Sequence, residues 1–318
     1  MKAIRANSYG SADVLKYINV EKPIPNSDEL LVQVKASSVN PIDWKIRRGD
    51  LKVLSGWTCP KKLGCDFAGI VQQVGSEVRD YQVGDEVYGF INPLKGGAYA
   101  QYLTVPSKIV ALKSPDISFE QAAAIPVAGL AALQSLWDLG KIKPGMKVLI
   151  NGASGGVGIF AVQISNALYA KVTGVCRQKN SALVKRLGAD RVIDYTQQDF
   201  TQENIKYDLI FDAVGKRNFS ECINNLTNSG VYVTTLPTVG NLIASLTTLI
   251  LSKRKAKIIA VQSKAQDLRL FNRLIEVGKL EIVIDQVFAL SEIANAHQYS
   301  ETGRAVGKII LSIDEIIS

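Results

Sequence analysis

The amino-acid sequence predicts an α/β protein of two domains, one rich in β-strands and one a doubly wound parallel sheet. Three observations predict this class. The chain has 318 residues, which corresponds to about two domains of roughly 100 to 200 residues each. Short strand-forming runs between turn residues fill roughly the first 115 residues. Helical and strand-like segments then alternate, as they do in βαβ units.

The N-terminal region predicts an irregular, turn-rich β structure. Residues 30–36 alternate between apolar and polar side chains once the run has begun. Residues 69–75 form a short Val/Ile run bounded by glycines, and residues 83–89 repeat this pattern. Such runs, separated by turn residues, are typical of strands.

From residue 119 the composition changes to helix-forming Ala and Leu, and helices then alternate with strands. We expect helices at 121–124, 130–136, 157–168 and 181–187, and strands at 147–150, 171–175, 209–211, 231–233 and 257–261. This order predicts a parallel sheet with helices on both faces.

The C-terminal region begins with an amphipathic helix. Leu268, Phe271, Leu274 and Ile275 share one face of it, and Gly278 supplies its stop. The tail then reads as strand, helix and strand, and a segment of this kind can return to complete the first domain. The predicted domains are therefore residues 1–120 with 263–318, and residues 121–262.

The composition excludes several classes of site. The chain has one histidine, His297, so zinc and iron sites with several histidines cannot form, and any Ser-His-Asp or Cys-His chemistry would have to use this residue. The four cysteines lack paired CxxC spacing and indicate free thiols in a reducing compartment. We find no signal-peptide pattern, and the longest apolar stretch, 242–251, is shorter than the ~18 residues of a spanning helix. We therefore expect a cytoplasmic protein without a metal site.

A glycine-rich turn at residues 150–158 follows a predicted strand and opens a predicted helix. Gly155 and Gly156 would let backbone amides approach a pyrophosphate, and Gly158 would let the helix pack close to the strand. This setting favours a dinucleotide-binding site, with Ser154 and Val157 in the same turn. The alternative is a merely tight strand-to-helix turn.

The residues after the next strand predict which nicotinamide cofactor binds. An NAD site would place an acid about 20 residues after the glycine turn, whereas this chain has Arg177, Lys179 and Asn180 there and no acid between Val172 and Ala189. Two cations can each donate a charge-assisted hydrogen bond to a 2′-phosphate. The pattern therefore favours NADPH, and the alternative is a pair of solvated basic side chains.

Further motifs lie at residues 39–45, 64–69, 83–87, 96–100, 125–130 and 307–310. Together with the glycine turn, they resemble the medium-chain dehydrogenase/reductase superfamily, in its zinc-free quinone oxidoreductase branch, over essentially the whole chain. The closest similarity is to the plant quinone oxidoreductase homologues and enone reductases. Short-chain reductases are excluded, because none of the eleven tyrosines is followed by lysine four residues later.

This resemblance implies a GroES-like β-rich catalytic domain and a Rossmann domain. It implies reduction of enones or quinones by hydride from NADPH without zinc, since Asn40, Cys65, Asp66 and Ala124 stand where zinc members carry ligands. We expect Asn40 as a neutral donor and Lys45 as a cation near the substrate oxygen, although Lys45 can equally point to water. Asp43 can simply cap a turn, and Trp44 is either a core aromatic or a wall of the site. The resemblance also places these residues along the cofactor: Val127, Ala128, Ser154, Tyr195, Val214, Gly215 and Lys308.

The charge pattern bears on partners. Lys+Arg 37 against Asp+Glu 29 gives a net charge of +8, but the cations are scattered, and no nucleic-acid partner is expected. The basic run 253–257, next to the apolar stretch 242–251, is a solvated helix end or a weak peripheral membrane contact. The resemblance implies a dimer or tetramer, and we expect a homodimer through the strand at 257–261. The alternative function is an NADPH-binding protein without significant catalysis, and the sequence leaves open which enone or quinone is reduced and what supplies the α-carbon proton.

Overall fold

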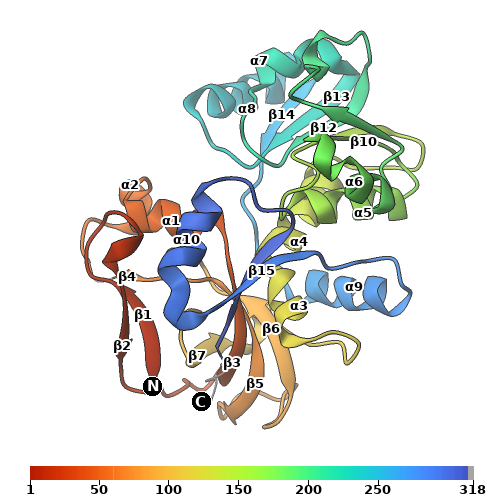
Figure 1. Ribbon diagram of the computed structural model, residues 1–318. Coiled ribbons are helices and arrows are strands. Elements are labelled where there is room, and N and C mark those ends of the chain that lie inside the picture. Colours follow the sequence, from red (N-terminus) through yellow and green to blue (C-terminus); the bar gives the residue numbers. More distant parts are fainter. Residues whose placement is uncertain (60, 314–318) are drawn as a thin grey trace. The chain divides into compact units, whose positions relative to one another are not determined.

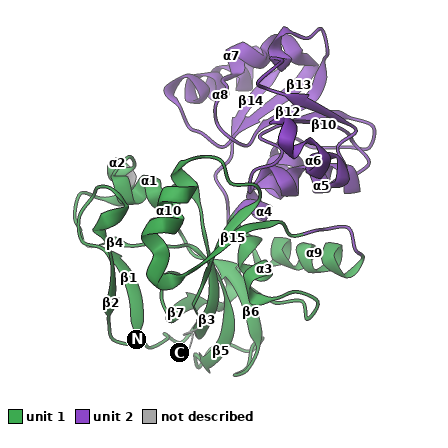
Figure 2. Ribbon diagram, in the orientation of Figure 1, with its two compact units in different colours: residues 1–127, 263–277, 282–318 green, residues 128–262, 278–281 purple. Residues whose placement is uncertain are grey.

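The computed structural model describes residues 1–59 and 61–313, and their elements fall into two units (Figure 2). Unit 1 comprises Met1–Val127, Ser263–Val277 and Ile282–Ser318, and unit 2 comprises Ala128–Gln262 and Gly278–Glu281. Unit 2 includes Gly278–Glu281 beyond the predicted domain 121–262, and it begins at Ala128 rather than at residue 121. The reason is that α3 (Phe119–Ala124) packs on β3 (Glu29–Val39) and β5 (Asp66–Val74) of unit 1.

Unit 1 is built on a large mixed sheet. Within residues 1–59 and 61–313 this sheet has the strand order β15-β16-β3-β5-β6-β8, with β7 also paired to β3, and a smaller sheet has the order β2-β1-β4. The predicted runs at 30–36, 69–75 and 83–89 fall on β3, β5 and β6. Besides β3 and β5, the strands of the two sheets are β1 (Lys2–Ala6), β2 (Leu15–Asn19), β4 (Lys61–Lys62), β6 (Glu86–Phe90), β7 (Tyr102–Pro106), β8 (Val110–Leu112), β15 (Ile284–Ala289) and β16 (Lys308–Ser312).

One helix of unit 1, α1 (Pro41–Arg48), interrupts a region for which the sequence predicted only strands and turns. Local signals explain it. Pro41 stands at the first helical position, the Asp43 carboxylate accepts the Asn40 backbone N–H at 2.8 Å, and Gly49 ends the helix at φ +85°. Among the described residues, the other α-helices that lie wholly in this unit are α2 (Lys52–Ser55), α3, α9 (Ala265–Glu276) and α10 (Ile293–Glu301), and α9 confirms the amphipathic helix.

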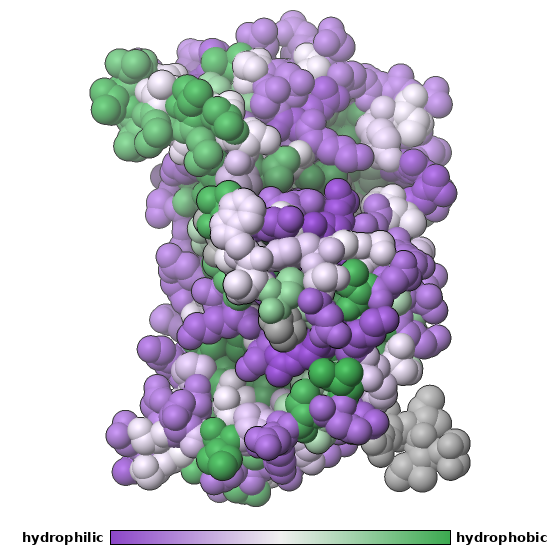
Figure 3. All heavy atoms as spheres, turned by 90° about the vertical axis from the view of Figure 1, so that its left-hand side faces the viewer, coloured by the Kyte–Doolittle hydropathy of each residue, from purple (hydrophilic) through white to green (hydrophobic). Residues whose placement is uncertain are grey.

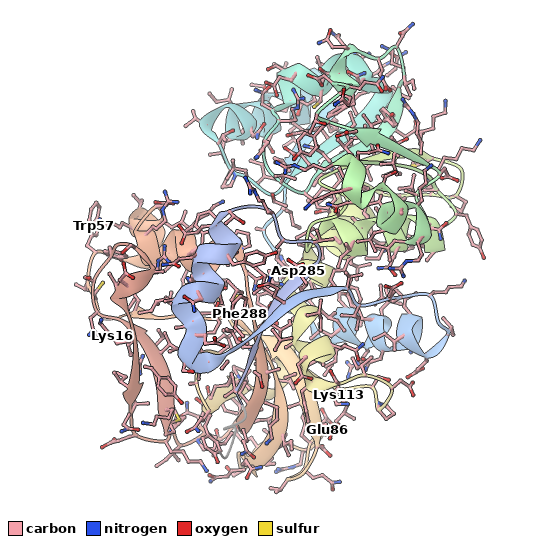
Figure 4. The ribbon with its side chains drawn as sticks, viewed as in Figure 1. Lys16, Trp57, Glu86, Lys113, Asp285 and Phe288 are labelled. Carbon is pink, nitrogen blue, oxygen red and sulfur yellow. The ribbon has the colours of Figure 1, made fainter. Side chains whose placement is uncertain are left out.

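The C-terminal segment completes unit 1, as its strand-helix-strand pattern suggested (Figure 1). β16 pairs antiparallel with β3, with Ile309 opposite Val39, and β15 runs parallel to β16. Tyr299 of α10 donates a hydrogen bond to Asp285 of β15 at 2.6 Å, and its ring lies 6.3 Å from that of Phe288. Figure 4 labels Asp285 and Phe288 on β15. These contacts hold α10 against the strand pair that β16 belongs to.

Unit 2 contains the parallel sheet. Its strand order across the described residues is β11-β10-β9-β12-β13-β14. All pairs are parallel, and the chain adds strands outward on one side of β9 and then, from β12 on, on the other side. Right-handed crossovers then place α5 and α6 on one face and α7 and α8 on the other (Figure 1). The strands are β9 (Lys147–Asn151), β10 (Lys171–Cys176), β11 (Arg191–Asp194), β12 (Tyr207–Asp212), β13 (Leu226–Thr234) and β14 (Lys255–Ile258), and the helices are α5 (Gly158–Ala167), α6 (Ser181–Arg186), α7 (Phe219–Cys222) and α8 (Val239–Leu251).

The predicted strands and helices of this unit are confirmed apart from their ends. The last strand was placed at 257–261, whereas β14 spans Lys255–Ile258. Its position is decided by pairing with β13, which joins Val231 to Lys255 and Thr234 to Ile258. The helix α4 (Pro126–Leu133) continues into a π-helical turn, Gln134–Leu139.

Candidate active site

A group of buried polar side chains lies in unit 1 where β3 ends, β5 begins and β16 begins. We call it the polar cluster. Strand pairing explains why residues far apart in sequence meet there, because Ser38 is opposite Asp66, and Ile309, the neighbour of Lys308, is opposite Val39. Each member exposes 3% or less of its surface. The members are Ser38, Asn40, Asp43, Cys65, Asp66, Tyr99 and Lys308.

Asp66 is the centre of the polar cluster. Its Oδ2 accepts hydrogen bonds from Ser38 Oγ at 2.5 Å and from Asn40 Nδ2 at 2.8 Å. Its Oδ1 accepts the backbone N–H of Val127, in the first turn of α4, at 2.9 Å. A buried carboxylate with this many donors is well compensated. Asp66 therefore ties the end of β3 to the start of α4, a role that sequence reasoning missed.

Asn40 is held at both ends of its amide. Its Nδ2 donates to Asp66, and its Oδ1 accepts a hydrogen bond from Lys308 Nζ at 2.6 Å. Asn40 Nδ2 also lies 3.6 Å from Cys65 Sγ. The predicted donor to the substrate is thus 3% exposed and already bonded, so its role toward a substrate stays a prediction.

Asp43 has a second role besides capping α1. Its Oδ2 accepts the Tyr99 hydroxyl at 3.0 Å in addition to the Asn40 N–H, and its Oδ1 lies 3.7 Å from Cys65 Sγ. Burial raises the pKa of this carboxyl to about 7, although the hydrogen bonds from Asn40 and Tyr99 lower it in part. Burial also raises the pKa of the Cys65 thiol well above its usual value. Cys65 is therefore a neutral packing group.

Lys45 lies elsewhere on α1. Its side chain is half-buried, with Nζ 5.6 Å from the centre of the Trp44 ring, and the Arg48 guanidinium lies 5.5 Å from the same ring. Burial lowers the pKa of Lys45, and nearby Asp50 partly offsets this. Among the interactions of the described residues, none joins Lys45 to the polar cluster. The structure thus does not bring Lys45 and Asn40 together, and the catalytic role of Lys45 stays a prediction.

His297 is a packing residue. It is fully buried on α10, and its ring meets that of Tyr99 edge-on, with centroids 5.7 Å apart and an interplanar angle of 75°. Burial, followed by the nearby Arg47 charge, lowers the pKa of His297 to about 3. The imidazole is therefore neutral near pH 7 and supports Tyr99, which the sequence analysis placed only within a motif.

The glycine turn of unit 2 has the geometry that the sequence predicted. Gly152 follows β9 at φ +84°. A Cβ atom at Gly158 would lie 2.0 Å from the Gly152 carbonyl oxygen, so only glycine allows α5 to begin this close to the turn. At Gly155 the nearest atom to such a Cβ is 3.4 Å away. A Cβ atom at Gly155 would therefore meet only an ordinary van der Waals contact, unlike one at Gly158.

The predicted phosphate-binding residues gather at the carboxyl ends of β10 and β11. Arg177 Nε donates to the Tyr195 hydroxyl at 2.7 Å, and Asn180 Nδ2 donates to Ser154 Oγ at 3.0 Å. The first bond is possible because Cys176 and Asp194 are paired at the ends of β10 and β11, and the second because Asn151 and Val175 are paired at the ends of β9 and β10. Lys179 is exposed in the same 3₁₀ turn as Asn180. Four of the predicted cofactor residues thus form two hydrogen-bonded pairs, Arg177 with Tyr195 and Asn180 with Ser154.

The remaining predicted cofactor residues are spread over three elements. Val127 and Ala128 lie in the first turn of α4, and Val214 and Gly215 follow β12. Lys308 belongs to the polar cluster, where its ammonium group is 3% exposed and bonded to Asn40. Its predicted contact with a cofactor stays a prediction.

One functional-looking residue of unit 2 was missed by sequence reasoning. Asp212, fully buried at the end of β12, accepts hydrogen bonds from Asn151 Nδ2 at 2.8 Å and from the backbone N–H of Gly215 and Arg217 at 3.1 and 2.8 Å. It therefore shapes the loop after β12 at the edge where nucleotide folds bind ligands. An acid directly after a buried strand was the signal available in the sequence.

Residues 1–59 and 61–313 contain neither a group of side chains arranged for a metal ion nor a membrane-spanning helix. No group of three or more His, Cys, Asp or Glu side chains is arranged to hold a metal ion. No helix in this part of the chain is long and apolar enough to cross a membrane.

Comparison with known proteins gives two family matches. Residues 26–116 match the alcohol dehydrogenase GroES-like domain, and residues 187–311 match the family described as zinc-binding dehydrogenase. The first match lies within unit 1, and the second covers the later part of unit 2 together with the C-terminal segments of unit 1.

Individual relatives cover almost the whole chain. The chloroplast envelope quinone oxidoreductase homolog of Arabidopsis thaliana is 34% identical, with 98% of each chain covered. The NADPH-dependent alkenal/one oxidoreductase of the same plant is 33% identical over 98% of this chain and 79% of its own. The quinone oxidoreductase structure from Coxiella burnetii superposes with a TM-score of 0.91 at 33% identity, with 99% of each chain covered. With its GroES-like and Rossmann-like folds, this chain belongs to the medium-chain dehydrogenase/reductase superfamily, among relatives named quinone oxidoreductases.

Proposed function

We propose that the protein is a zinc-independent, NADPH-dependent oxidoreductase that reduces the activated C=C bond of enones, or quinones, by hydride transfer. The observation that carries the proposal is the arrangement in unit 2, where Ser154 of the glycine turn is hydrogen-bonded to Asn180, in the segment after β10 that also holds Arg177 and Lys179. A relative named an NADPH-dependent alkenal/one oxidoreductase supports both the cofactor and the substrate class.

The residues of unit 2 fit NADPH. The pyrophosphate would take the backbone amides of the glycine turn and the N-terminus of α5. Arg177 and Lys179 are exposed and offer their charges to the 2′-phosphate, and Tyr195 orients Arg177 through its hydroxyl. When bound, NADPH supplies a hydride from its nicotinamide ring.

A conjugated acceptor suits a site of this kind. Hydride added to the β-carbon of an enone, or to a quinone, spreads negative charge onto an oxygen that hydrogen-bond donors can stabilise. In the reduction of an isolated carbonyl, hydrogen-bond donors stabilise the developing charge less, and a Lewis acid such as a metal ion is needed to polarise the C=O bond. Enone and quinone reduction use the same cofactor geometry, and water can supply the α-carbon proton, so the experiment tests both substrates.

The test is NADPH oxidation, followed by its absorbance, with methyl vinyl ketone and with a benzoquinone. We expect turnover of at least one of them. The second candidate function, NADPH binding without significant catalysis, would be supported by tight NADPH binding with no turnover across a broad panel of both classes. Turnover of either acceptor refutes it.

We also propose that the protein forms a homodimer through α8 and β14. Seven large apolar side chains of α8 are between 46% and 83% exposed, and the face drawn in Figure 3 carries clustered hydrophobic side chains. β14 is an edge strand, so its outer backbone groups can pair with another strand. The seven side chains are Val239, Leu242, Ile243, Leu246, Leu249, Ile250 and Leu251.

A second copy is favoured over a membrane as the occupant of this surface, because the basic run after α8 is engaged within the protein. Lys255 Nζ donates to the carbonyls of Thr248 and Leu249, Lys257 Nζ to that of Leu139, and Arg254 Nε to that of Thr227. Such cations are less available to lipid phosphates.

The dimer proposal is tested by light scattering after size-exclusion chromatography. The wild type should have twice the chain mass, and Leu246→Glu with Ile250→Glu should have the mass of one chain. Val277→Glu, at an exposed apolar position of unit 1, is the matched control. A monomeric wild type that floats with anionic vesicles in a salt-sensitive manner would overturn the dimer and favour the membrane contact. The cytoplasmic location stays a prediction that cell fractionation tests.

A further inference from the structure

The polar cluster does not fit the zinc ion that one family description suggests. Zinc in proteins takes three or four Cys, His, Asp or Glu ligands, with cysteine bound as thiolate. Here burial raises the pKa of the Cys65 thiol, and Asn40 turns its amide nitrogen toward both Cys65 and Asp66. An ammonium group stands beside the oxygens, with Lys308 Nζ 2.6 Å from Asn40 Oδ1 and 3.6 Å from Asp66 Oδ2.

We propose that Lys308 is a positioning residue whose ammonium group serves as the cation of the polar cluster in place of a metal ion and fixes the orientation of Asn40. The inference rests on the proposed function only in so far as Asn40 acts on the substrate. It differs from the expectation that Lys308 contacts the cofactor and that Lys45 is the cation near Asn40.

The fold delivers Lys308 to this place through strand pairing. Gly307 has φ +88°, and a Cβ atom there would lie 2.3 Å from the Val283 carbonyl oxygen, so only glycine permits this entry into β16. The Lys308 backbone N–H donates to the same carbonyl at 3.0 Å. The pairing of Ile309 with Val39 then sets Lys308 beside Asn40. A lysine that is 3% exposed is costly unless its charge is paired, and Asp66 and Asn40 supply the partners.

The donor and acceptor pattern leaves one orientation for the Asn40 amide. Lysine can only donate, so it must face Oδ1. Asp66 accepts from Nδ2, which must therefore point the other way. Without the ammonium group, Oδ1 loses its donor inside a buried site, and the reason for this orientation is gone. Asp66 also bonds the Val127 N–H, so the effect of Lys308 extends to the first turn of α4.

The experiment compares Lys308→Met, Lys308→Arg, Asp66→Asn, the double variant Lys308→Met/Asp66→Asn and the matched control Lys16→Met. Lys16 is an exposed lysine of β2 in the same unit (Figure 4). For each variant we would measure kcat and KM with methyl vinyl ketone, the NADPH dissociation constant by fluorescence, and the midpoint of urea unfolding.

We expect Lys308→Met to lower kcat by about tenfold to a hundredfold, as the loss of a charge-assisted hydrogen bond predicts. The NADPH dissociation constant should stay within about twofold of the wild type, because the phosphate-binding residues lie in unit 2. Lys308→Arg should retain more activity than Lys308→Met, and Lys16→Met should match the wild type. The double variant removes both buried charges, so its unfolding midpoint should recover while kcat stays low.

Two results would overturn the proposal. Recovery of kcat together with stability in the double variant would mean that Lys308 only balances a charge. One zinc ion per chain, found by elemental analysis of purified wild type, would mean that a metal is the cation.

The NMR signal of the Asn40 side chain gives a further readout that does not depend on activity. In protein labelled with ¹⁵N-asparagine, the side-chain amide signal of Asn40, assigned by its loss in Asn40→Ser, should shift in Lys308→Met and not in Lys16→Met. An unshifted signal would also overturn the proposal. If the wild type reduces neither acceptor, the proposed function fails, and the amide signal and metal content still decide the role of Lys308.

Discussion

Asp43→Asn should change how the stability of the protein depends on pH. Asp43 is 1% exposed, and burial raises its pKa to about 7, against about 3.9 for an aspartate in an unfolded chain. The folded state therefore holds a proton on this carboxyl over a range in which the unfolded state has lost it. The contribution of Asp43 is favourable at low pH and is lost as the pH rises from about 4 to about 7.

The size of the effect follows from the shift. A difference of about three pKa units at 1.36 kcal/mol per unit gives about 4 kcal/mol once the pH exceeds both values. Between about pH 5 and about pH 8, the part that is lost is about 3 kcal/mol. Asparagine keeps an oxygen that can accept from the Asn40 N–H and the Tyr99 hydroxyl, and it does not titrate.

The assay is urea unfolding of the wild type and Asp43→Asn at about pH 5 and about pH 8. The variant should gain about 3 kcal/mol relative to the wild type on going from the lower to the higher pH. Asp80→Asn, at an exposed position of the same unit, should change in parallel with the wild type. If the curves of wild type and Asp43→Asn are also parallel, the carboxyl does not titrate near pH 7, and the account of its burial is wrong.

Three further predictions concern the cofactor site and the single histidine. Arg177→Ala with Lys179→Ala should weaken NADPH by about tenfold to a hundredfold in a fluorescence titration and leave NADH almost unchanged, and equal losses would refute the assignment to the 2′-phosphate. Gly158→Ala should abolish NADPH binding and lower the unfolding midpoint, since the new Cβ would lie 2.0 Å from the Gly152 oxygen; Gly240→Ala, with no atom within 4 Å, should do neither. Burial lowers the pKa of His297 to about 3, so below about pH 6.5 the unfolded state binds a proton that the folded state does not. The free energy of unfolding therefore falls as the pH falls from about 6.5 toward 3. The ¹⁵N shifts of the His297 ring should therefore report the neutral form at about pH 5, and a protonated ring at that pH would contradict the reasoning.

The sequence was most informative where the signal is local. The glycine turn, the strand before it and the helix after it are one continuous segment, and Arg177 and Lys179 follow the next strand directly. The helix α1 was missed although its signals, Pro41 and Asp43, are equally local, because the surrounding residues read as strands and turns. The end of β14 was misplaced because pairing with β13 decides it.

The polar cluster shows what sequence reasoning could not reach. Asn40 and Lys308 were both named as candidate residues, but for different sites, and their contact joins positions 268 residues apart. Nothing in either local sequence states that β16 pairs with β3 in a register that sets Lys308 beside Asn40. Without that pairing, Lys45, which is close in sequence, was the natural choice for the cation.

The sequence by itself thus determined the fold class and favoured NADPH as the cofactor, because periodic patterns, glycine requirements and charges next to a strand act over short distances along the chain. The superfamily followed from the resemblance of its motifs. Only the tertiary structure decided which polar groups meet in unit 1 and in which charge state they lie. A buried carboxyl or thiol takes its pKa from its burial and from its neighbours, and strand pairing brings most of those neighbours from remote parts of the sequence.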